Sequence, residues 1–490
     1  RQFYDVFAKL KDKCDDKYTR DAVREFIKND QDLRNPTLHW NSDDLHLDSI
    51  NVGGLSLLDG HTGHHGGQLA FEFKGAGEGE IPHLTSYEVR TLHRVWDIIA
   101  SQLGDFHDEK AYAGSVGDVL PKHGPGRVSN LRKDQSKFTF SDWPSKLERT
   151  FPYDRYGVVN LGHTPILDDA SRWPQNREHP SKLIAVPKTA TGPRLIGSEP
   201  NYHVWVQQLV RFQLEAAVRK TVLRNCISFG DQGPNGQLAL RGSRDGSIAT
   251  VDLKNASDRL SAWTVERVLR RNITLLERIH ACRTRSMRNA VDGQFNTMVV
   301  KKCFTQGNAL TFPVQTIIYS MIAIGCQVVT LGPSLNSAIK SSVLARASSD
   351  VRVFGDDIVV PVGTLPLLSR VLAYLQLKVN PAKTFHIGKF RESCGIDAYD
   401  GVNVTPARIK QYSLSPSHEV IESLKQASNN FWLKGMWHVA DWITNQLPRH
   451  MLPIVPPHDS DGLISFCGYS DDHLKKRYNR RLHRHEMRTL

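Results

Sequence analysis

The sequence predicts an α+β protein in which antiparallel strands joined by tight turns pack on helices. Two segments read as β-hairpins, 182–200 and 351–360, because short β-branched runs flank turns that contain Gly. A third segment, Ile317–Val329, has the length and composition of a buried helix. At 490 residues the chain is long enough for about three domains or subdomains.

The composition excludes wholesale disorder and favours a polyanionic partner. Hydrophobic residues make up 40% of the chain and charged residues 23%, which is ordinary for a folded soluble protein. The 63 Lys and Arg residues exceed the 51 Asp and Glu residues, which leaves a net charge of +12. Such a surplus suits nucleic acid, although basic enzymes without a polyanionic partner also exist.

Cysteine usage and hydropathy indicate a reducing compartment and no membrane. The seven Cys residues include no Cys-x-x-Cys pair, which argues against a disulfide scaffold or a zinc ribbon. Ile317–Val329 is shorter than a membrane span and contains polar residues. The chain has no signal peptide and begins with Arg1, so we expect its natural N-terminus to be missing or processed.

Gly355-Asp356-Asp357 is the strongest local signal of chemistry. Two apolar runs flank it, so the acids are expected at the tip of a buried hairpin. Burying neighbouring carboxylates costs several kcal/mol unless a cation compensates their charge, and a divalent metal ion would do so. Taken alone, an ordinary solvent-facing turn is the more common explanation for such a tripeptide.

Two further acids lie upstream. Asp252 ends a β-rich run that begins at Ile248, and Asp258 is expected to start a long helix that continues to about Arg288. This spacing places both carboxylates near one cleft, where Asp252 could hold metal and Asp258 could accept a hydrogen bond from a hydroxyl. A helix N-cap is an equally good explanation for Asp258.

A basic hairpin and a Gly-Asn pair complete the candidate site. Lys188 and Arg194 stand at either end of the turn in 182–200, where they could clamp a triphosphate; a basic surface hairpin is the alternative. Gly307 would allow close approach to a ligand, and Asn308 offers both a donor and an acceptor. A plain helix cap is the alternative for Asn308.

The remaining regions are less informative. The Gly-rich stretch 52–67 carries three His residues, which could form a metal cluster, but its Gly content favours a flexible loop. From about residue 411, helices rich in Trp predict a separate C-terminal subdomain. The last sixteen residues hold seven Lys and Arg residues and one acid, so this tail contacts RNA or is disordered in solvent.

In this order the segments resemble the palm of a viral RNA-dependent RNA polymerase. In finer detail they are similar to the catalytic (beta) subunit of the replicase of levivirus-type RNA bacteriophages. The resemblance covers roughly residues 180 to 410 and rests on Val186-Pro187-Lys188, Arg194, Glu199-Pro200, Ala249–Leu253, Ala256–Asp258, Gly307-Asn308, Phe354–Ile358, Lys383–Phe385 and Phe390–Gly395. Some members have a further Gly after Gly-Asn and acids in the next helix. This chain has Ala309 and no acid through Val329, which indicates a diverged member.

The resemblance implies a right-hand fold with fingers, palm and thumb. It assigns residues 1–245 to an N-terminal region and fingers, which include the basic hairpin 182–200. Residues 246–410 would form the palm, an antiparallel sheet packed on helices that carries the catalytic motifs. Residues 411–490 would form a helical thumb and the basic tail.

The resemblance also assigns roles at the metal site. Asp252 and Asp356, with the Leu253 carbonyl, are expected to hold two Mg²⁺ ions, for which Mn²⁺ could substitute, and Asp357 is expected to support them. Attack of a 3′-hydroxyl on an α-phosphate needs one metal ion at the nucleophile and another at the leaving pyrophosphate, and oxygen ligands suit Mg²⁺.

Other positions would bind the nucleotide. Asp258 and Gly307-Asn308 are expected to read the ribose and its 2′-hydroxyl. Lys188 and Arg194 are expected to bind the triphosphate, and Lys383 to act as general acid toward pyrophosphate. His386 is the second candidate for that proton, although core packing is the more common role for such a residue.

The implied function is an RNA-directed RNA polymerase, a nucleotidyltransferase that replicates a single-stranded RNA phage genome in the cytoplasm of an infected bacterium. Its partners would be RNA template and product, ribonucleoside triphosphates, the host elongation factors Tu and Ts, and a ribosomal protein. One alternative is a reverse transcriptase, but Asn255, Ala256 and Ser257 beside Asp258 include no bulky side chain that would exclude a 2′-hydroxyl. The other is a non-catalytic RNA-binding protein, although all three metal-site acids are present.

Overall fold

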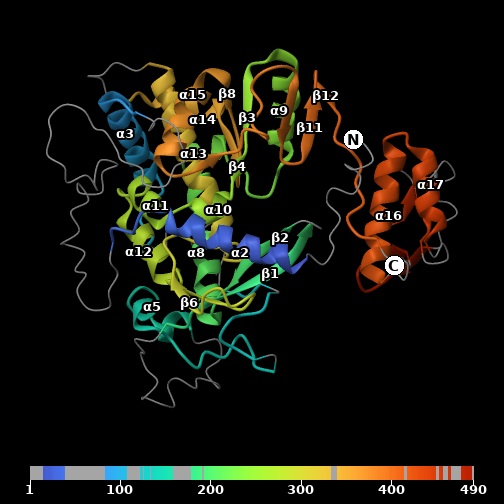
Figure 1. The fold of residues 1–490 in the computed structure, drawn as a ribbon, viewed down its shortest axis with the longest axis horizontal. Helices are drawn as coiled ribbons and strands as arrows, with labels where there is room; N and C mark the ends of the chain where they lie inside the picture. The colour runs from blue at the N-terminus through green and yellow to red at the C-terminus, as the bar shows by residue number, and fades with distance from the viewer. Residues whose placement is uncertain are drawn as a thin grey trace. The chain divides into compact units, whose positions relative to one another are not determined.

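The larger part of the molecule is built around helix α13 (Thr311–Thr330), whose residues are almost all buried (Figure 1). The predicted buried helix is therefore confirmed. By length and composition α13 could cross a membrane, but 89% of its most apolar window is buried inside the protein. Helix α3 (Ser86–Gln102) packs on it at Gly325, and the indole Nε1 of Trp96 donates to the Met321 carbonyl at 3.0 Å.

The computed structural model describes residues 15–38, 83–107, 122–124, 126–132, 134–157, 178–189, 192–332, 339–412, 417–447, 452–455, 462–464 and 476–487. They form a mixture of helices and mostly antiparallel strands, as the α+β prediction expects. The His-containing stretch 52–67 lies outside them. The chain divides into two compact units, of which the larger contains 23–184 and 195–404 and the smaller contains 1–22, 185–194 and 405–490.

A three-stranded antiparallel sheet lies against α13 in the larger unit. Its order is β3 (Ile248–Val251), β8 (Asp357–Pro361) and β7 (Arg352–Phe354). Phe354 pairs with Asp357, so the turn consists of Gly355 and Asp356, and Gly355 takes a φ of +63° that suits glycine. The hairpin predicted at 351–360 is confirmed.

A second strand pair extends this region toward residues 378–385. Strand β4 (Leu253–Lys254) pairs with β9 (Lys378–Val379), and Thr250 forms an antiparallel bridge with Phe385. The chain after β9 therefore runs beside the strand that ends at Asp252.

The long helix predicted to reach Arg288 is wrong. The segment forms α10 (Ala256–Arg259), α11 (Ala262–Val268) and α12 (Ile273–Cys282), followed by strand β5 (Ser286–Asn289). The side chains of Ser261 and Asn272 accept hydrogen bonds from the backbone of Thr264 and Leu275, so each starts a new helix.

The basic hairpin is present as predicted. Strands β1 (Ser181–Thr189) and β2 (Gly192–Ser198) are neighbours in a sheet of order β2-β1-β5-β6, in which β6 is Thr297–Val299. Helix α8 (Asn201–Arg219) follows it. The other elements of the larger unit are α5 (Ser145–Thr150), α6 (Tyr153–Tyr156), η4 (Val222–Asn225), α9 (Gly233–Asp245), α14 (Ser341–Asp350), η5 (Val362–Thr364), α15 (Leu365–Tyr374), β10 (Phe390–Ser393), β11 (Ile396–Tyr399) and β12 (Val402–Asn403); helix α2 (Asp16–Gln31) begins in the smaller unit and continues into the larger one.

The smaller unit has its own apolar core. Helices α16 (His418–Leu433) and α17 (Trp437–Asn445) pack on each other, as the helical prediction for this region expects. Short strand pairs accompany them: β13 (Ile454–Val455) with β14 (Leu463–Ile464), and β15 (Lys476–Asn479) with β16 (Arg484–Met487). Residues 476–487 of the basic tail are thus a hairpin, and disorder does not describe them.

Candidate active site

The acids predicted to bind metal come from neighbouring strands of the β3-β8-β7 sheet. Val251 pairs with Ile358 in antiparallel register, so Asp252 lies opposite Asp357 at the end of the sheet. Asp356 is exposed at the hairpin turn, whose Gly355 N–H donates to the Thr316 hydroxyl of α13 at 3.1 Å. Local strand and turn chemistry therefore brings the three acids into one neighbourhood.

The charges of these acids act on one another. Burial, followed by the negative charge of Asp356, raises the pKa of Asp357 to about 6; Asp252 adds to the effect, and a hydrogen bond from Cys394 opposes it. The Asn380 amide donates to the Asp252 carboxylate at 2.8 Å, and the Asn380 N–H donates to the Asp252 carbonyl at 2.8 Å. Asp252 is thus held in place, while burial and the neighbouring negative charges make ionisation of Asp357 less favourable.

The donor atoms fit Mg²⁺. Carboxylates of Asp252 and Asp356 and the carbonyl of Leu253 are oxygen ligands of the type that Mg²⁺ prefers. A positive ion there would relieve the repulsion that raises the pKa of Asp357. Among the described residues, however, no group of three or more His, Cys, Asp and Glu side chains is already arranged to hold a metal ion.

Asp258 forms an ion pair and does not cap its helix. Its carboxylate Oδ1 lies 3.2 Å from the ammonium Nζ of Lys302, and its side chain is 18% exposed. The N-cap of α10 is Asn255, so the capping explanation for Asp258 is wrong. The exposed fraction of Asp258 leaves this carboxylate accessible to a ligand.

Gly307 and Asn308 lie at the turn before α13. Gly307 has a φ of +102°, and a Cβ there would meet the Gly197 carbonyl oxygen at 2.5 Å, so packing against β2 already requires glycine. The carboxamide oxygen of Asn308 accepts from the Leu310 N–H at 2.8 Å, which supports the turn, while Leu310 itself is the N-cap residue. Ligand binding by these two residues stays a prediction.

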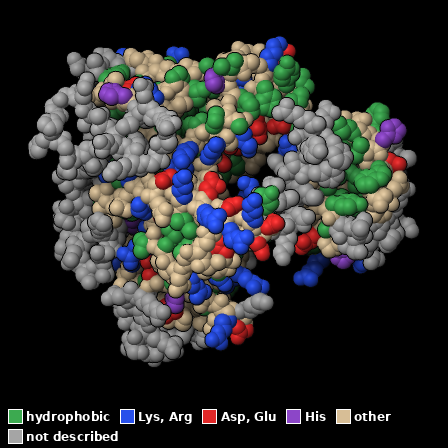
Figure 2. Space-filling model, viewed as in Figure 1, with side chains coloured by type: hydrophobic (Ala, Val, Ile, Leu, Met, Phe, Trp, Pro, Cys, Tyr) green, Lys and Arg blue, Asp and Glu red, His purple; other side chains and the backbone are tan. Residues whose placement is uncertain are grey.

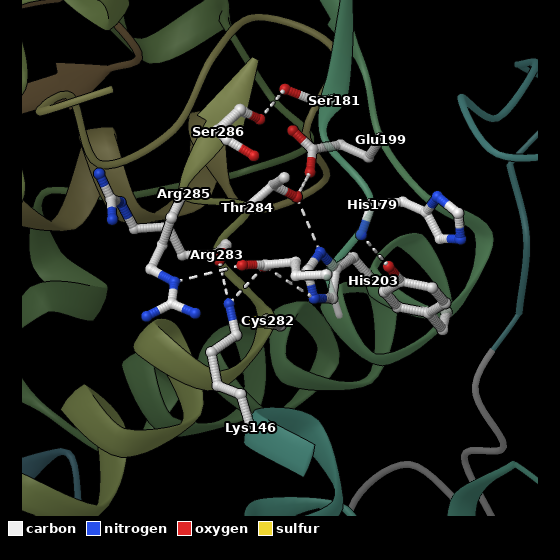
Figure 3. Close-up of polar contacts among 12 residues, drawn as sticks. Lys146, His179, Ser181, Glu199, His203, Cys282, Arg283, Thr284, Arg285 and Ser286 are labelled. Atoms are coloured by element: carbon white, nitrogen blue, oxygen red, sulfur yellow. Dashed lines mark hydrogen bonds and ion pairs between the residues drawn. The ribbon is translucent and has the colours of Figure 1, made fainter. Parts of the chain in front are cut away.

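A buried polar network continues from Asn308 (Figure 3). The Glu199 carboxyl interacts with Asn308 and accepts a hydrogen bond from the Thr284 hydroxyl, and His203 Nδ1 lies 2.7 Å from the same hydroxyl. Burial raises the pKa of Glu199 to about 7 against the effect of these hydrogen bonds. Burial lowers the pKa of His203 to about 3, so the ring is neutral. The other ring nitrogen of His203, Nε2, lies 3.4 Å from the Glu178 carboxylate.

The far end of this network is an ion-pair cluster. Glu178 lies 2.5 Å from Lys146 Nζ and 3.2 Å from Arg285 Nε, and Lys146 also donates to the Arg283 carbonyl at 2.6 Å. These cations and His203 outweigh burial and lower the pKa of Glu178 to about 2. The network is thus charged at Glu178 and near neutral at Glu199, next to Asn308.

The three predicted cations, Lys188, Arg194 and Lys383, are exposed. Lys188 and Arg194 are exposed on β1 and β2, on opposite sides of the hairpin turn. Lys383 is exposed, and its N–H donates to the carbonyl of Asn380, the residue that holds Asp252. His386 is also exposed, so core packing is the wrong explanation for it.

The structure adds residues that sequence reasoning missed as parts of this site: Lys302, Asn380, Cys394 and Glu199. Each lies in or near a segment already singled out, but its sequence context carries no sign of its partner. A buried lysine and a surface lysine look alike in a sequence, so only the fold identifies these contacts.

Comparison with known proteins gives consistent matches. The family described as "RNA replicase, beta-chain" matches residues 149–439, more than half of the chain. The chain is 30% identical over 296 residues to the "RNA-directed RNA polymerase subunit beta" of Qbeta virus (strain MX1), which covers 58% of this chain and 45% of that protein. It is 34% identical over 230 residues to the "RNA-directed RNA polymerase beta chain" of Escherichia phage MS2, which covers 47% of this chain and 37% of that protein.

The matches cover only part of these relatives. The chain spans less than half the length of the curated relatives it matches. A solved structure titled "RdRp complex" matches with a TM-score of 0.42 and 12% identity, and the match covers 71% of this chain and 32% of that one.

Proposed function

Because the chain belongs to the RNA replicase beta-chain family, we propose that it is an RNA-directed RNA polymerase that joins ribonucleoside triphosphates on a single-stranded RNA template. The observation that carries the proposal is the strand register that sets Asp252 beside the Gly355-Asp356-Asp357 turn. In this reading β3, β7 and β8 belong to the palm of a right-hand fold, residues before 246 to the fingers and residues after 410 to the thumb.

Asp252 and Asp356, with the Leu253 carbonyl, would hold two Mg²⁺ ions or Mn²⁺ in their place. When bound, these ions would lower the energy of the attacking 3′-oxygen and of the leaving pyrophosphate. Asn380 keeps the Asp252 carboxylate oriented, and Asp357 adds negative charge beside the site. Because a bound cation favours the charged form, it would return the pKa of Asp357 toward its ordinary value.

The remaining roles concern the nucleotide. Asp258 would accept a hydrogen bond from the ribose 2′-hydroxyl, with Asn308 and Gly307 nearby. Lys188 and Arg194 would neutralise the triphosphate, and Lys383 would donate a proton to pyrophosphate. The exposure of these three cations supports access to a ligand.

RNA as the partner is supported by charge. The chain carries a net +12, and Figure 2 shows Lys and Arg side chains gathered on the central part of the face in view, with Asp and Glu among them. We also propose that the protein works in the cytoplasm of an infected bacterium, and that elongation factors Tu and Ts and a ribosomal protein are its partners there.

The test is incorporation of labelled ribonucleotides and deoxyribonucleotides on an RNA template with Mg²⁺, with and without bacterial extract. We expect ribonucleotide incorporation that Asp356→Ala abolishes, because the turn carboxylate would be a metal ligand. Asp400→Ala is the matched control, since it removes an exposed carboxylate that pairs with Lys389 at 2.7 Å.

Each outcome of this assay is distinct. Synthesis from deoxyribonucleotides would indicate a reverse transcriptase. RNA binding without synthesis in any condition, by wild type and Asp356→Ala alike, would contradict the polymerase proposal and leave an RNA-binding protein. Activity that needs the extract would support a host partner.

A further inference from the structure

Lys302 is a buried ammonium group beside Asp258. Its side chain is fully buried, its Nζ lies 3.2 Å from Asp258 Oδ1, and it lies 3.3 Å from the centre of the Phe26 ring. A buried charge persists when it is paired, and the carboxylate and the aromatic face both favour a cation here. The ammonium therefore acts as a fixed positive charge behind the Asp258 carboxylate.

The main chain of Lys302 is held on both sides. Its N–H donates to Asp30 Oδ1 at 3.1 Å, and the N–H of Lys301 donates to both carboxylate oxygens of Asp30 at 3.0 and 3.1 Å. The guanidinium of Arg283 donates to the Lys302 carbonyl. These hydrogen bonds fix the backbone of residues 301 and 302, so the Lys302 side chain starts from a well-defined position.

Lys302 also lies next to the other predicted sugar-reading residue. It lines a small cavity together with Asn308, Glu199 and Thr305. Lys302 thus lies at a cavity that Asn308 also lines, while its ammonium contacts Asp258. The two residues expected to read the ribose share Lys302 as a common neighbour.

We propose that Lys302 is a positioning residue for ribose selectivity: its ammonium holds the Asp258 carboxylate in one orientation toward the 2′-hydroxyl. The proposal rests on the proposed function, because it needs Asp258 to contact the sugar. An ion pair to one oxygen leaves the other free to accept.

Lys302→Met tests the proposal, with Lys301→Met as its matched control. The Lys301 ammonium donates to the carbonyls of Gln31 and Leu33 at 3.2 and 3.0 Å and does not serve Asp258. The measurement is kcat/KM for one ribonucleotide and for its deoxyribonucleotide on a primed RNA template. The selectivity ratio is kcat/KM for the ribonucleotide divided by kcat/KM for the deoxyribonucleotide. We expect Lys302→Met to lower this ratio by about 10- to 100-fold, which is the usual contribution of a hydrogen bond to a charged group. The loss should arise from a higher KM for the ribonucleotide. Lys301→Met should leave the ratio unchanged.

Asp258→Asn separates failure of this proposal from failure of the proposed function. If wild type makes no RNA, or if Asp258→Asn keeps the wild-type ratio, the proposed polymerase or the proposed sugar contact is wrong. If Asp258→Asn lowers the ratio and Lys302→Met does not, the role of Lys302 is wrong. The double variant should have the ratio of Asp258→Asn alone, because Lys302 acts through Asp258.

Thermal unfolding would reveal a folding defect in Lys302→Met. In that case the same measurement is made on two more conservative variants. Lys302→Arg keeps the positive charge and Lys302→Gln keeps only a donor. The selectivity ratio should be highest in wild type, lower in Lys302→Arg and lowest in Lys302→Gln. A wild-type ratio in Lys302→Gln would overturn the proposal.

Discussion

At the scale of the residue, Glu199 is an acid whose environment favours its neutral form. It is buried in the network of Figure 3, where Thr284 and Asn308 are hydrogen-bonding partners and no cation contacts its carboxyl among the interactions described. Glu178, in the same network, has Lys146 and Arg285 as partners and remains charged. Two acids of one network thus differ in charge because only one of them has cations beside it.

Glu199→Gln should change how stability depends on pH. The pKa of Glu199 in the folded protein is about 7, above its ordinary value of 4.5, so its contribution to stability is present below the ordinary value and is lost as the pH rises through about 7. Glutamine resembles the neutral acid at every pH. The variant should therefore gain up to about 3 kcal/mol relative to wild type between about pH 5 and about pH 8.

The measurement is the free energy of unfolding by denaturant at both pH values. Glu215→Gln is the control, because Glu215 pairs with Arg211 near the surface. Equal differences between Glu199→Gln and wild type at the two pH values would mean that Glu199 is charged throughout.

At the scale of the element, the sheet that carries the acids is supported by α13, and α13 is in turn covered by α3. Gly325 permits this close approach: a Cβ at that position would lie 2.8 Å from Leu92 Cδ2 and 3.0 Å from the Trp96 indole nitrogen. The same helix also holds the Gly355-Asp356 turn through the hydroxyl of Thr316. Packing at the α3–α13 contact is therefore linked to the position of Gly355.

Gly325→Leu should destabilise the protein by about 1–3 kcal/mol, because the added side chain forces the two helices apart. Gly230→Leu is the control, since a Cβ at Gly230 meets no atom within 4 Å. The measurement is the free energy of unfolding, with ribonucleotide incorporation as a second readout. Equal free energies of unfolding for the two variants would mean that α3 can shift away from α13 without loss of stability.

At the scale of the whole molecule, the positive net charge should govern RNA binding. Affinity for a single-stranded RNA should fall as salt rises, with a log–log slope of about −0.7 for each phosphate contacted. Asp356→Ala should bind RNA at least as tightly as wild type, because it removes one exposed negative charge. Fluorescence anisotropy between about 50 and about 200 mM salt measures both. An affinity independent of salt would contradict an electrostatic interface.

Local patterns were sufficient for the elements that carry the acids. The hairpin around Gly355, the strand that ends at Asp252 and the buried helix α13 were all predictable, because turn chemistry and hydrophobic periodicity act within a few residues. Their order along the chain was also enough to indicate the family that the comparison then matched.

The helix boundaries after Asp258 were not predictable from periodicity, because short polar caps at Ser261 and Asn272 interrupt an otherwise helical pattern. The burial of individual polar residues was equally hidden, since His386 was expected in the core and is exposed, while Lys302 is fully buried.

The sequence by itself determined which residues are candidates for the chemistry and in which kind of local element each one lies. Only the tertiary structure decided what each of them touches: Lys302 meets Asp258 across 44 residues, Thr284 meets Glu199 across 85, and Asn380 meets Asp252 across 128. The physical reason is that strand and turn preferences act between neighbours in the chain, whereas charge pairing and burial depend on which distant segments the fold brings together.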